Sequence, residues 1–306
     1  MSILFIHQNF PGQFRNIAKR LSDQPNIVLC IEKPSEPVPS KWSVFRYPIT
    51  KNNQTELTSW VLDIESKAIR GEACARAASM LKDKGFTPDL IVGHPGWGEL
   101  MFIKQIWPHA PVLCYQEFYY QPTGFDYDFD HEYQEMPPGW EARSRLQIKT
   151  INHDLGLSCS SWCITPTHFQ RSSFPYEAQK KISVIHDGID TQNAKAGSST
   201  TEISLIGGPS LCKGDSVVTF VNRTLEPYRG CHTFIRSIPH IQKLAPEAQI
   251  VVVGDTKGVS YGAPCPDGEW KDIFLREIEG QYDPSRVHFV GKLPYEQFIP
   301  LLQISA

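Results

Sequence analysis

The sequence has no excess of either charge and no long hydrophobic run. Its 306 residues contain 30 Lys and Arg against 33 Asp and Glu, which gives a net charge of -3. This balance removes the bulk attraction by which basic proteins bind nucleic acid or anionic membranes. No apolar run approaches the roughly 20 residues that a membrane-spanning helix needs. We therefore predict no transmembrane segment and no nucleic-acid partner, and leave peripheral membrane contact open.

The N-terminus and the cysteines indicate a cytoplasmic protein. Residues 1–7 are apolar for only a few positions and lack a basic start and a cleavage site, which predicts a strand rather than a signal peptide. The eight cysteines are scattered through the chain, at positions 30, 74, 114, 159, 163, 212, 231 and 265. Only Cys159 and Cys163 are close neighbours, and no second pair follows at zinc-site spacing. We predict buried free thiols and no metal site.

Short β-rich runs alternate with helical stretches along the whole chain. In the first half the pattern predicts strands over 3–6, 26–31, 90–92, 111–115, 162–165 and 182–185, and helices over 13–21 and 57–84. In the second half it predicts strands over 217–221, 250–253 and 287–290, and helices over 231–244, 269–279 and 295–302. Because the strands are unbroken apolar runs, both faces of each sheet must be covered, as in parallel α/β structures.

The length predicts two domains. We expect two Rossmann-like, doubly wound domains that face a cleft, one over 1–190 and one over 216–306. Residues 191–215 are rich in Gly, Ser, Thr and Asn and predict a linker or interdomain loop. The strand–helix pattern stops within 302–306, so we expect the second domain to be incomplete.

Ligands of open α/β sheets bind beyond the carboxyl ends of the strands. Arg223 and Arg229 flank one such end and could clamp a diphosphate beside a helix N-terminus. The alternative is an arginine paired with Glu226 on the surface. The loop 8–12 could present backbone amides around Gly12 to a phosphate, although a simple tight turn explains it as well.

Two further strand ends carry candidate residues. His94 could hydrogen-bond a polar ligand, or it could be satisfied locally. Glu117 precedes the aromatic residues 118–120 and could bind hydroxyls while the rings stack on a sugar; alternatively it is an ordinary loop residue. The segment 126–135 mixes aromatic and acidic residues, which suits either an acceptor-binding loop or a solvated acidic loop.

Several segments together resemble the group 1 (family 4) retaining glycosyltransferases of GT-B architecture. Residues 220–230, Phe-Val-Asn-Arg-Thr-Leu-Glu-Pro-Tyr-Arg-Gly, resemble the donor-site turn of that family. Residues 185–191 resemble its interdomain segment, 88–94 and 248–255 resemble two of its strands, and 287–302 are similar to a later strand and helix. The resemblance covers almost all of the chain, in the right order.

The resemblance implies an N-terminal acceptor domain, a C-terminal nucleotide-sugar domain and transfer with retention of configuration. It assigns Arg223, Arg229 and Gly12 to the donor diphosphate, where fixed positive charge stabilises the leaving group. It matches His94 to a family histidine at the cleft, and we take His94 and Glu117 as the candidate catalytic residues. The remaining donor or cleft positions are Asn222, Gly254, Asp255 and Gly291.

Some positions depart from the family pattern. Asn222 stands where a glycine is usual, Arg229 replaces a lysine one position earlier, and Glu117 stands where the family often has histidine. The paired glutamates of the family, separated by seven residues, would follow the point at which this chain stops. Glu269 and Glu277 have that spacing but precede strand 287–290, so we interpret them as solvated helix positions.

These features predict a hexosyltransferase-like glycosyltransferase of polysaccharide biosynthesis, whose activity as this chain stays open. We expect no cofactor and no metal, with a nucleotide-sugar as co-substrate, because no Asp-x-Asp pair lies at a strand end. Asp126 and Asp128 have that spacing, but they lie in the aromatic segment. The acceptor would be a carbohydrate or lipid-linked molecule. The alternatives are a nucleotide-sugar-binding module without turnover, truncated or degenerate, and a sugar-nucleotide epimerase, which would need further carboxylates beside the donor.

Overall fold

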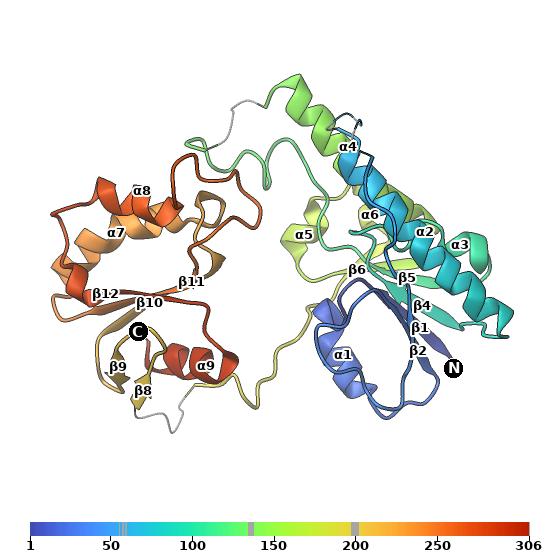
Figure 1. Cartoon of the computed structure of the whole chain (residues 1–306), viewed down its shortest axis with the longest axis horizontal. Helices are drawn as coiled ribbons and strands as arrows, with labels where there is room; N and C mark the ends of the chain where they lie inside the picture. The colour runs from blue at the N-terminus through green and yellow to red at the C-terminus, as the bar shows by residue number, and fades with distance from the viewer. Residues whose placement is uncertain (55, 57, 59, 134–137, 197–201, 306) are drawn as a thin grey trace. The chain divides into compact units, whose positions relative to one another are not determined.

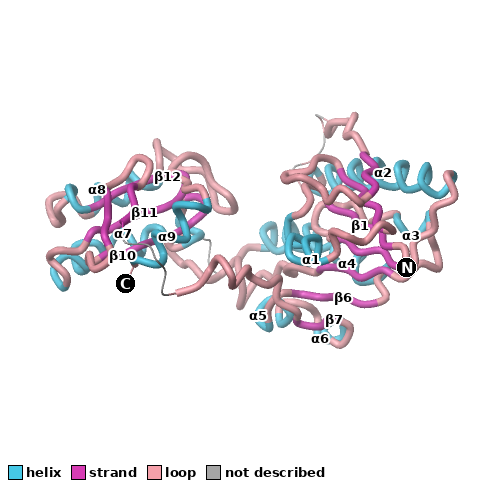
Figure 2. Tube along the Cα trace, turned by 90° about the horizontal axis from the view of Figure 1, so that it is seen from below, coloured by secondary structure: helices cyan, strands magenta, loops and turns pink. Residues whose placement is uncertain are grey.

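The structure is a computed structural model that describes residues 1–54, 56, 58, 60–133, 138–196 and 202–305. The chain divides into two compact units, Met1–Ile189 (unit 1) and Asp190–Ala306 (unit 2) (Figure 1). Each unit contains a parallel β-sheet with helices packed against it, as Figure 2 shows by secondary structure. The predicted α/β fold class with parallel sheets is therefore confirmed.

Unit 1 has seven parallel strands in the order β3-β2-β1-β4-β5-β6-β7. They are β1 (Ile3–His7), β2 (Ile27–Ile31), β3 (Ser43–Arg46), β4 (Leu90–Gly93), β5 (Val112–Tyr115), β6 (Trp162–Thr165) and β7 (Ile182–Val184). The helices are α1 (Arg15–Arg20), α2 (Leu62–Asp83), α3 (Ile103–Ile106), α4 (Trp140–Cys159), α5 (His168–Ser172) and α6 (Tyr176–Gln179). The strand order reverses beside β1, and ligands of such sheets bind at this switch point.

Both faces of the unit 1 sheet are buried, because successive side chains of a strand point to opposite faces. Leu4 and Ile6 of β1 pack in a core that includes residues of α2. Ile3 and Phe5 of the same strand pack in a second core with the residues around α1. The sheet is thus a central layer between helices, and its exposed functional positions are restricted to its edges.

Unit 2 has three parallel strands in the order β10-β11-β12 and an antiparallel hairpin, β8-β9. The strands are β8 (Glu202–Ser204), β9 (Ser210–Cys212), β10 (Val217–Thr224), β11 (Gln249–Asp255) and β12 (Val287–Gly291), and the helices are α7 (Cys231–Leu244), α8 (Trp270–Glu277) and α9 (Tyr295–Ile304). Val251 and Val253 pack with the hairpin and α9 on one face. Helices α7 and α8 cover the other face (Figure 1).

Two sequence predictions differ from the structure, and one long helix was not predicted. The helix predicted over 57–84 begins at Leu62, because a turn precedes it. In this turn the backbone N–H of Val61 donates to the Thr58 carbonyl. Leu57 lies outside the described residues. The predicted linker 191–215 contains the β8-β9 hairpin, whose Ile203 and Leu211 are buried in the unit 2 core. Helix α4 was not predicted, because its buried side is mostly polar and gives no apolar periodicity.

Candidate functional site

Polar side chains meet at the carboxyl edge of the unit 1 sheet. His7 ends β1, His94 directly follows β4, and Glu117 lies two residues beyond β5. Because β1, β4 and β5 are neighbours in the sheet, these side chains come together. The structure places the predicted pair in contact, with Nε2 of His94 at 3.2 Å from Oε2 of Glu117.

Gln13 links this pair to His7. Its Nε2 donates to Oε2 of Glu117 at 3.3 Å, and its Oε1 lies 2.9 Å from Nε2 of His7. Gln13 was not predicted, because it lies in a helical turn, Gly12–Phe14, and not directly after a strand. No pattern in the sequence marks it, since it meets Glu117 only through the fold.

The hydrogen bonds assign a tautomer to each histidine. The backbone N–H of Asn9 donates to Nδ1 of His7 at 3.2 Å, and that of Gly96 donates to Nδ1 of His94 at 2.9 Å. In a neutral imidazole, the nitrogen that accepts a hydrogen bond carries no proton. Both rings therefore carry the proton on Nε2, and His94 donates it toward the Glu117 carboxylate.

Both histidines are buried, whereas Glu117 reaches the surface. His7 is 1% exposed and His94 is 3% exposed, but the side chain of Glu117 is 43% exposed. Burial is the main cause that lowers the pKa of His7 from 6.5 to about 4, so this ring is neutral at neutral pH. The His94 ring lies between Trp97, at 4.3 Å, and Tyr115, at 5.5 Å. A ligand would therefore reach the carboxylate first.

Gly12 opens the turn that carries Gln13. Its φ of +45° lies in the left-handed region, and a Cβ at this position would collide with the ring of His7. Only glycine allows this backbone to pass so close to the buried histidine. Gly12 itself is exposed, and its contact with a donor diphosphate stays a prediction.

The segment 185–189, within the stretch that resembles the family's interdomain segment, is attached to the same edge. The hydroxyl of Tyr115 donates to Oδ1 of Asp187 at 2.8 Å, and Nδ2 of Asn16 donates to the Asp187 carbonyl at 2.8 Å. Burial, and then Asp187, raise the pKa of Tyr115. Tyr115 thus connects this segment to the stacked His94 ring.

The aromatic segment that follows Glu117 is folded onto α5. The Phe118 ring lies 6.1 Å from that of Phe125 and 6.2 Å from that of Phe169. The Asp128 carboxylate accepts the backbone N–H groups of Gly124 at 2.8 Å and of Phe125 at 3.2 Å, so it shapes this turn. Glu135, the end of the predicted loop 126–135, lies outside the described residues.

The predicted donor residues gather at the carboxyl edge of the unit 2 sheet. Asn222 and Arg223 lie near the end of β10, Gly254 and Asp255 end β11, and Gly291 ends β12. The pairing of β10 with β11 is irregular between Val221 and Thr224, so Asn222 and Arg223 lie outside the regular ladder. Their side chains are therefore directed by the local turn and not by sheet pairing alone.

Arg223 is exposed, and it makes no hydrogen bond or ion pair with the part of the chain that the structure describes. Its neighbour Asn222 is instead tied down, because Nδ2 donates to the carbonyl of Arg229 at 2.9 Å. The strand end and the following turn are thus held together, while the Arg223 guanidinium stays available to an anion.

Glu226 anchors the second arginine. Its fully buried carboxylate accepts the backbone N–H groups of Ser260 at 3.0 Å, Tyr261 at 3.3 Å and Gly262 at 2.9 Å. Nε of Arg229 lies 3.5 Å from Oε1 of Glu226, and its guanidinium carbon lies 4.9 Å from the centre of the Tyr261 ring. Glu226 is therefore an internal anchor and not the surface partner considered from the sequence.

A pocket lies at the ends of β11 and β12. It is lined by Asp255, Thr256, Lys257, Lys271, Phe289, Val290, Gly291 and Lys292. The Asp255 carboxylate accepts hydrogen bonds from the Lys292 ammonium at 2.9 Å and from the backbone N–H of Lys257 at 3.1 Å. These bonds hold the pKa of Asp255 below its usual range, and the bond from Lys292 has the larger effect. The predicted Asp255 and Gly291 thus share a pocket with three lysines, which suits an anionic or polar ligand.

Glu269 and Glu277 make local contacts. Oε2 of Glu277 accepts a hydrogen bond from Nε of Arg236 at 2.6 Å, and a carboxylate oxygen of Glu269 lies 3.8 Å from the ammonium of Lys271. Both side chains are partly exposed. Glu277 is the last residue of α8 and Glu269 directly precedes this helix, so their interpretation as solvated positions stays a prediction.

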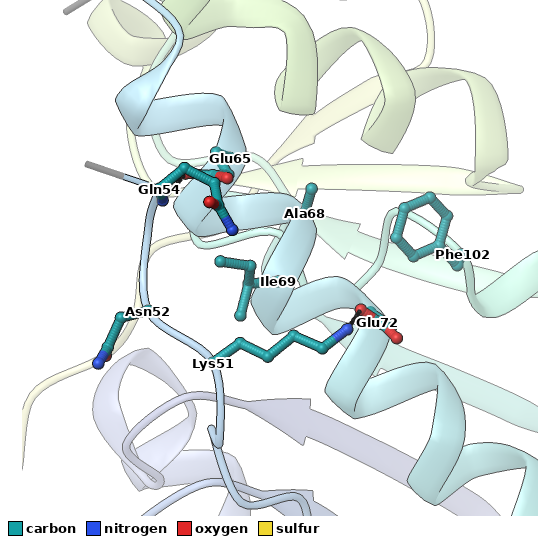
Figure 3. Close-up of a pocket in the computed structure, with 8 residues that line it drawn as sticks. All are labelled: Lys51, Asn52, Gln54, Glu65, Ala68, Ile69, Glu72 and Phe102. Atoms are coloured by element: carbon teal, nitrogen blue, oxygen red, sulfur yellow. Dashed lines mark hydrogen bonds and ion pairs between the residues drawn. The ribbon is translucent and has the colours of Figure 1, made fainter. Parts of the chain in front are cut away.

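A second pocket lies on unit 1 between α2 and the segment 51–54 (Figure 3). Its lining is formed by Lys51, Asn52, Gln54, Glu65, Ala68, Ile69, Glu72 and Phe102. Lys51 reaches across to Glu72 at 2.7 Å. None of the residues predicted from the sequence lines this pocket, so they lie at the sheet edges and not in this hollow.

All eight cysteines are free thiols, and five of them are buried. Cys212 is exposed at an outward position of the β8-β9 hairpin, so the prediction that the thiols are buried is wrong for this residue. Within the described ranges, no helix combines the length and the apolar character needed to cross a bilayer. Likewise, the described side chains form no group of three metal-binding residues.

Parallel α/β units with sites at the carboxyl edges of their sheets are the parts from which GT-B proteins are built. Residues 24–194 match the model of the glycosyl transferase family 4 group. The match spans more than half of the chain, so this protein belongs to that family. The resemblance inferred from the sequence motifs is thereby confirmed. No curated protein sequence matches the chain.

Solved structures share the fold at low identity. An α,α-trehalose-phosphate synthase (UDP-forming) from Burkholderia vietnamiensis is 12% identical with a TM-score of 0.61, and the match covers 100% of this chain and 77% of that one. The catalytic domain of starch synthase IV from Arabidopsis thaliana, bound to ADP and acarbose, is 14% identical with a TM-score of 0.59 and the same coverage, 100% and 77%. A UDP-GlcNAc 2-epimerase from Neisseria meningitidis, bound to UDP-GlcNAc, is 14% identical with a TM-score of 0.50, covering 100% and 76%. These similarities show the fold alone.

Proposed function

We propose that this protein transfers a sugar from a nucleotide-sugar donor to a hydroxyl of a carbohydrate or lipid-linked acceptor, with retention of configuration. Membership of the glycosyl transferase family 4 group supports sugar transfer in general. The observation that carries the proposal is Arg223, an exposed guanidinium without a partner among the described residues, in the same turn as Arg229. We propose the cytoplasm as its compartment, with the eight free thiols in support.

Unit 2 is the proposed donor domain. The diphosphate of a nucleotide-sugar gains negative charge as the bond to the sugar breaks, and preorganised positive groups lower the energy of that transition state. Arg223 and Arg229 supply this charge without a metal ion, because a guanidinium can donate two parallel hydrogen bonds to phosphate oxygens. Asn222 and Gly254 shape the strand ends, and the pocket of Asp255 and Gly291 receives another part of the donor.

Unit 1 is the proposed acceptor domain. The half-exposed Glu117 carboxylate accepts a hydrogen bond from the acceptor hydroxyl and draws its proton as the hydroxyl attacks. His94 and Gln13 both donate to Oε2 of Glu117, which fixes the direction of the carboxylate. Gly12 keeps its proposed role as a backbone contact for the diphosphate.

Calorimetry with UDP-, GDP- and ADP-sugars tests the donor site. At least one donor should bind the wild-type chain, and Arg223→Ala should weaken its binding about 10- to 100-fold, the loss expected for a charge-assisted hydrogen bond. Arg276→Ala is the matched control, since this exposed arginine lies on α8 and faces Asp267 at 3.8 Å. Absence of binding, or binding that Arg223→Ala leaves unchanged, would contradict the donor assignment.

An epimerase is the second candidate, favoured by the similar fold of the UDP-GlcNAc 2-epimerase. Product analysis separates the candidates. A transferase releases nucleoside diphosphate and forms a new glycosidic bond only when an acceptor is present. An epimerase changes the configuration of the bound sugar without an acceptor, and a binding module without turnover leaves the donor intact. Proton NMR of the donor after incubation with and without a mixed acceptor pool distinguishes all three.

A further inference from the structure

The loop 94–98, which follows β4, fixes the orientation of His94. The backbone N–H of Gly96 donates to Nδ1 of His94 at 2.9 Å, and the Trp97 ring stacks on the imidazole at 4.3 Å with an interplanar angle of 24°. Both contacts come from the loop itself. The tautomer and the direction of His94 Nε2 therefore depend on how firmly this loop is held.

Two helices hold the loop by its carbonyl groups. Nδ2 of Asn152, on α4, donates to the carbonyl of Pro95 at 2.8 Å. Nη1 of Arg70, on α2, donates to the carbonyl of Trp97 at 3.3 Å. The loop is thus attached on both sides of Gly96, the residue that donates to His94.

A buried lysine fixes the Asn152 amide. The Lys67 ammonium donates to Oδ1 of Asn152 at 2.9 Å and to Oδ2 of Asp63 at 2.6 Å. Lys67 is 8% exposed and Asn152 is 1% exposed, so water cannot replace these bonds easily. Because an ammonium can only donate, Lys67 forces the Asn152 oxygen toward itself and the NH2 group toward Pro95.

Close backbone approach brings α2 within reach of the loop. Gly98 has a φ of +104°, and a Cβ there would collide with the backbone carbonyl of Lys67. A Cβ on Gly71 would lie 2.7 Å from the Gly98 carbonyl. Other residues of α2 line the pocket in Figure 3, namely Glu65, Ala68, Ile69 and Glu72. Different residues of α2 therefore contact the loop and the pocket.

We propose that Asn152, oriented by Lys67, is a positioning residue for sugar transfer. It acts through the loop 94–98, which keeps His94 in the Nε2–H tautomer and aims that proton at Glu117. The proposal rests on the proposed function, in which Glu117 meets the acceptor hydroxyl. A small displacement at a reacting centre can lower the rate about 100-fold. The hydrogen-bonded chain Asp63–Lys67–Asn152–Pro95 therefore has a large effect on the transfer rate, although it does not touch the substrate.

Asn152→Asp is the decisive variant. It keeps the size of the side chain and the acceptor for Lys67, but it removes the donor to Pro95. We expect kcat for transfer to fall about 10- to 100-fold, the KM for the donor to stay within twofold, and the nitrogen-15 spectrum of His94 to lose its pure Nε2–H pattern. Lys67→Met frees the amide to rotate and should give a smaller loss of the same kind.

Thr150→Val is the matched control, because Thr150 is another buried polar residue of α4 whose hydroxyl contacts the Gln147 carbonyl at 2.8 Å and the Tyr119 side chain, and neither contact involves the loop 94–98. Thermal melting identifies variants that fail to fold, and Lys67→Met then decides. Unchanged kcat and an unchanged His94 spectrum in folded Asn152→Asp would overturn the proposal. A changed His94 spectrum with unchanged turnover would support the positioning of His94 and contradict its place in the proposed function.

Discussion

The carboxyl edges of the two sheets are built in opposite ways. At the edge of unit 1, His7 and His94 are almost fully buried, and they form a continuous set of hydrogen bonds with Gln13 and Glu117. At the edge of unit 2, the cationic Arg223 and Lys292 are exposed, and the buried group is the Glu226 carboxylate, which lies beside Arg229. At the unit 1 edge the polar side chains bond to one another, whereas the unit 2 edge presents positive charge to which an anion could bind.

This difference suits the two kinds of chemistry in the proposed function. A neutral hydroxyl needs an oriented acceptor more than it needs net charge, and unit 1 provides one carboxylate held by two donors. A diphosphate needs positive charge, and burying an arginine without a partner would be costly in the free protein. Unit 2 avoids that cost by leaving Arg223 in water and burying the anchor Glu226, whose partners are backbone N–H groups.

The largest expected effect is the loss of the anchor. Glu226→Ala should lower the free energy of unfolding of unit 2 by about 4 kcal/mol, because it leaves buried backbone N–H groups without an acceptor and Arg229 without its nearby charge. Urea denaturation, with hydrogen exchange of 256–268, measures this loss. Glu247→Ala, at an exposed position of the same unit, should change it by less than about 0.5 kcal/mol. A loss below 1 kcal/mol in the anchor variant would show that Glu226 is not structural.

The next largest effect is a pH dependence of the stability of unit 1, which comes from the buried His7. The unfolded chain protonates His7 below its ordinary pKa of 6.5, whereas the folded chain does so only below about 4. Unit 1 should therefore lose about 3 kcal/mol of stability from this residue as the pH falls from 6.5 to 4.

His7→Gln should remove this part of the pH dependence, which denaturation at a series of pH values would show. His109→Gln, at an exposed histidine of unit 1, should keep the wild-type slope. An equal slope in His7→Gln and wild type would mean that His7 is protonated in the folded protein at the same pH as in the unfolded one.

The smallest effect concerns the exposed pair in unit 2. Lys292→Ala should raise the pKa of Asp255 toward its usual value, since Lys292 is the first cause of its lowering. Stability should change by less than about 1 kcal/mol, because the pair is exposed to water. Carbon-13 NMR titration of Asp255 follows the pKa, with Lys243→Ala as the control. If the free energy of unfolding fell by several kcal/mol, the side chains at this edge would depend on one another for stability, as those at the unit 1 edge do.

The strand ends could be predicted from the sequence, because apolar runs such as 90–92 and 162–165 mark the strands and the fold class fixes where ligands bind. This is how His94 and Glu117 were found, and the structure places them in contact. Their roles stay predictions. The helix over 231–244 was also predicted with the bounds of α7, since its apolar residues recur at helical spacing.

The supporting residues could not be predicted. Gln13, Asn152 and Glu226 are polar residues that become buried or bonded only through contacts with distant segments, and their local sequence gives no sign of it. Helix α4 shows the same limit, because its buried positions include Thr150, Asn152 and His153. Periodicity arguments detect apolar faces, so a helix that packs through hydrogen bonds is invisible to them.

The sequence separation of these contacts has a consequence for the order of folding. The bond from Gln13 to Glu117 joins residues 104 positions apart, whereas Glu226 reaches Ser260 across 34 positions. Closing the longer loop costs about 1 kcal/mol more in chain entropy. More importantly, the polar cluster of unit 1 has no partners until β1, β4 and β5 are aligned, so it should be among the last features of that unit to form. The turn with Arg229 closes within one strand–helix–strand segment and should be in place early.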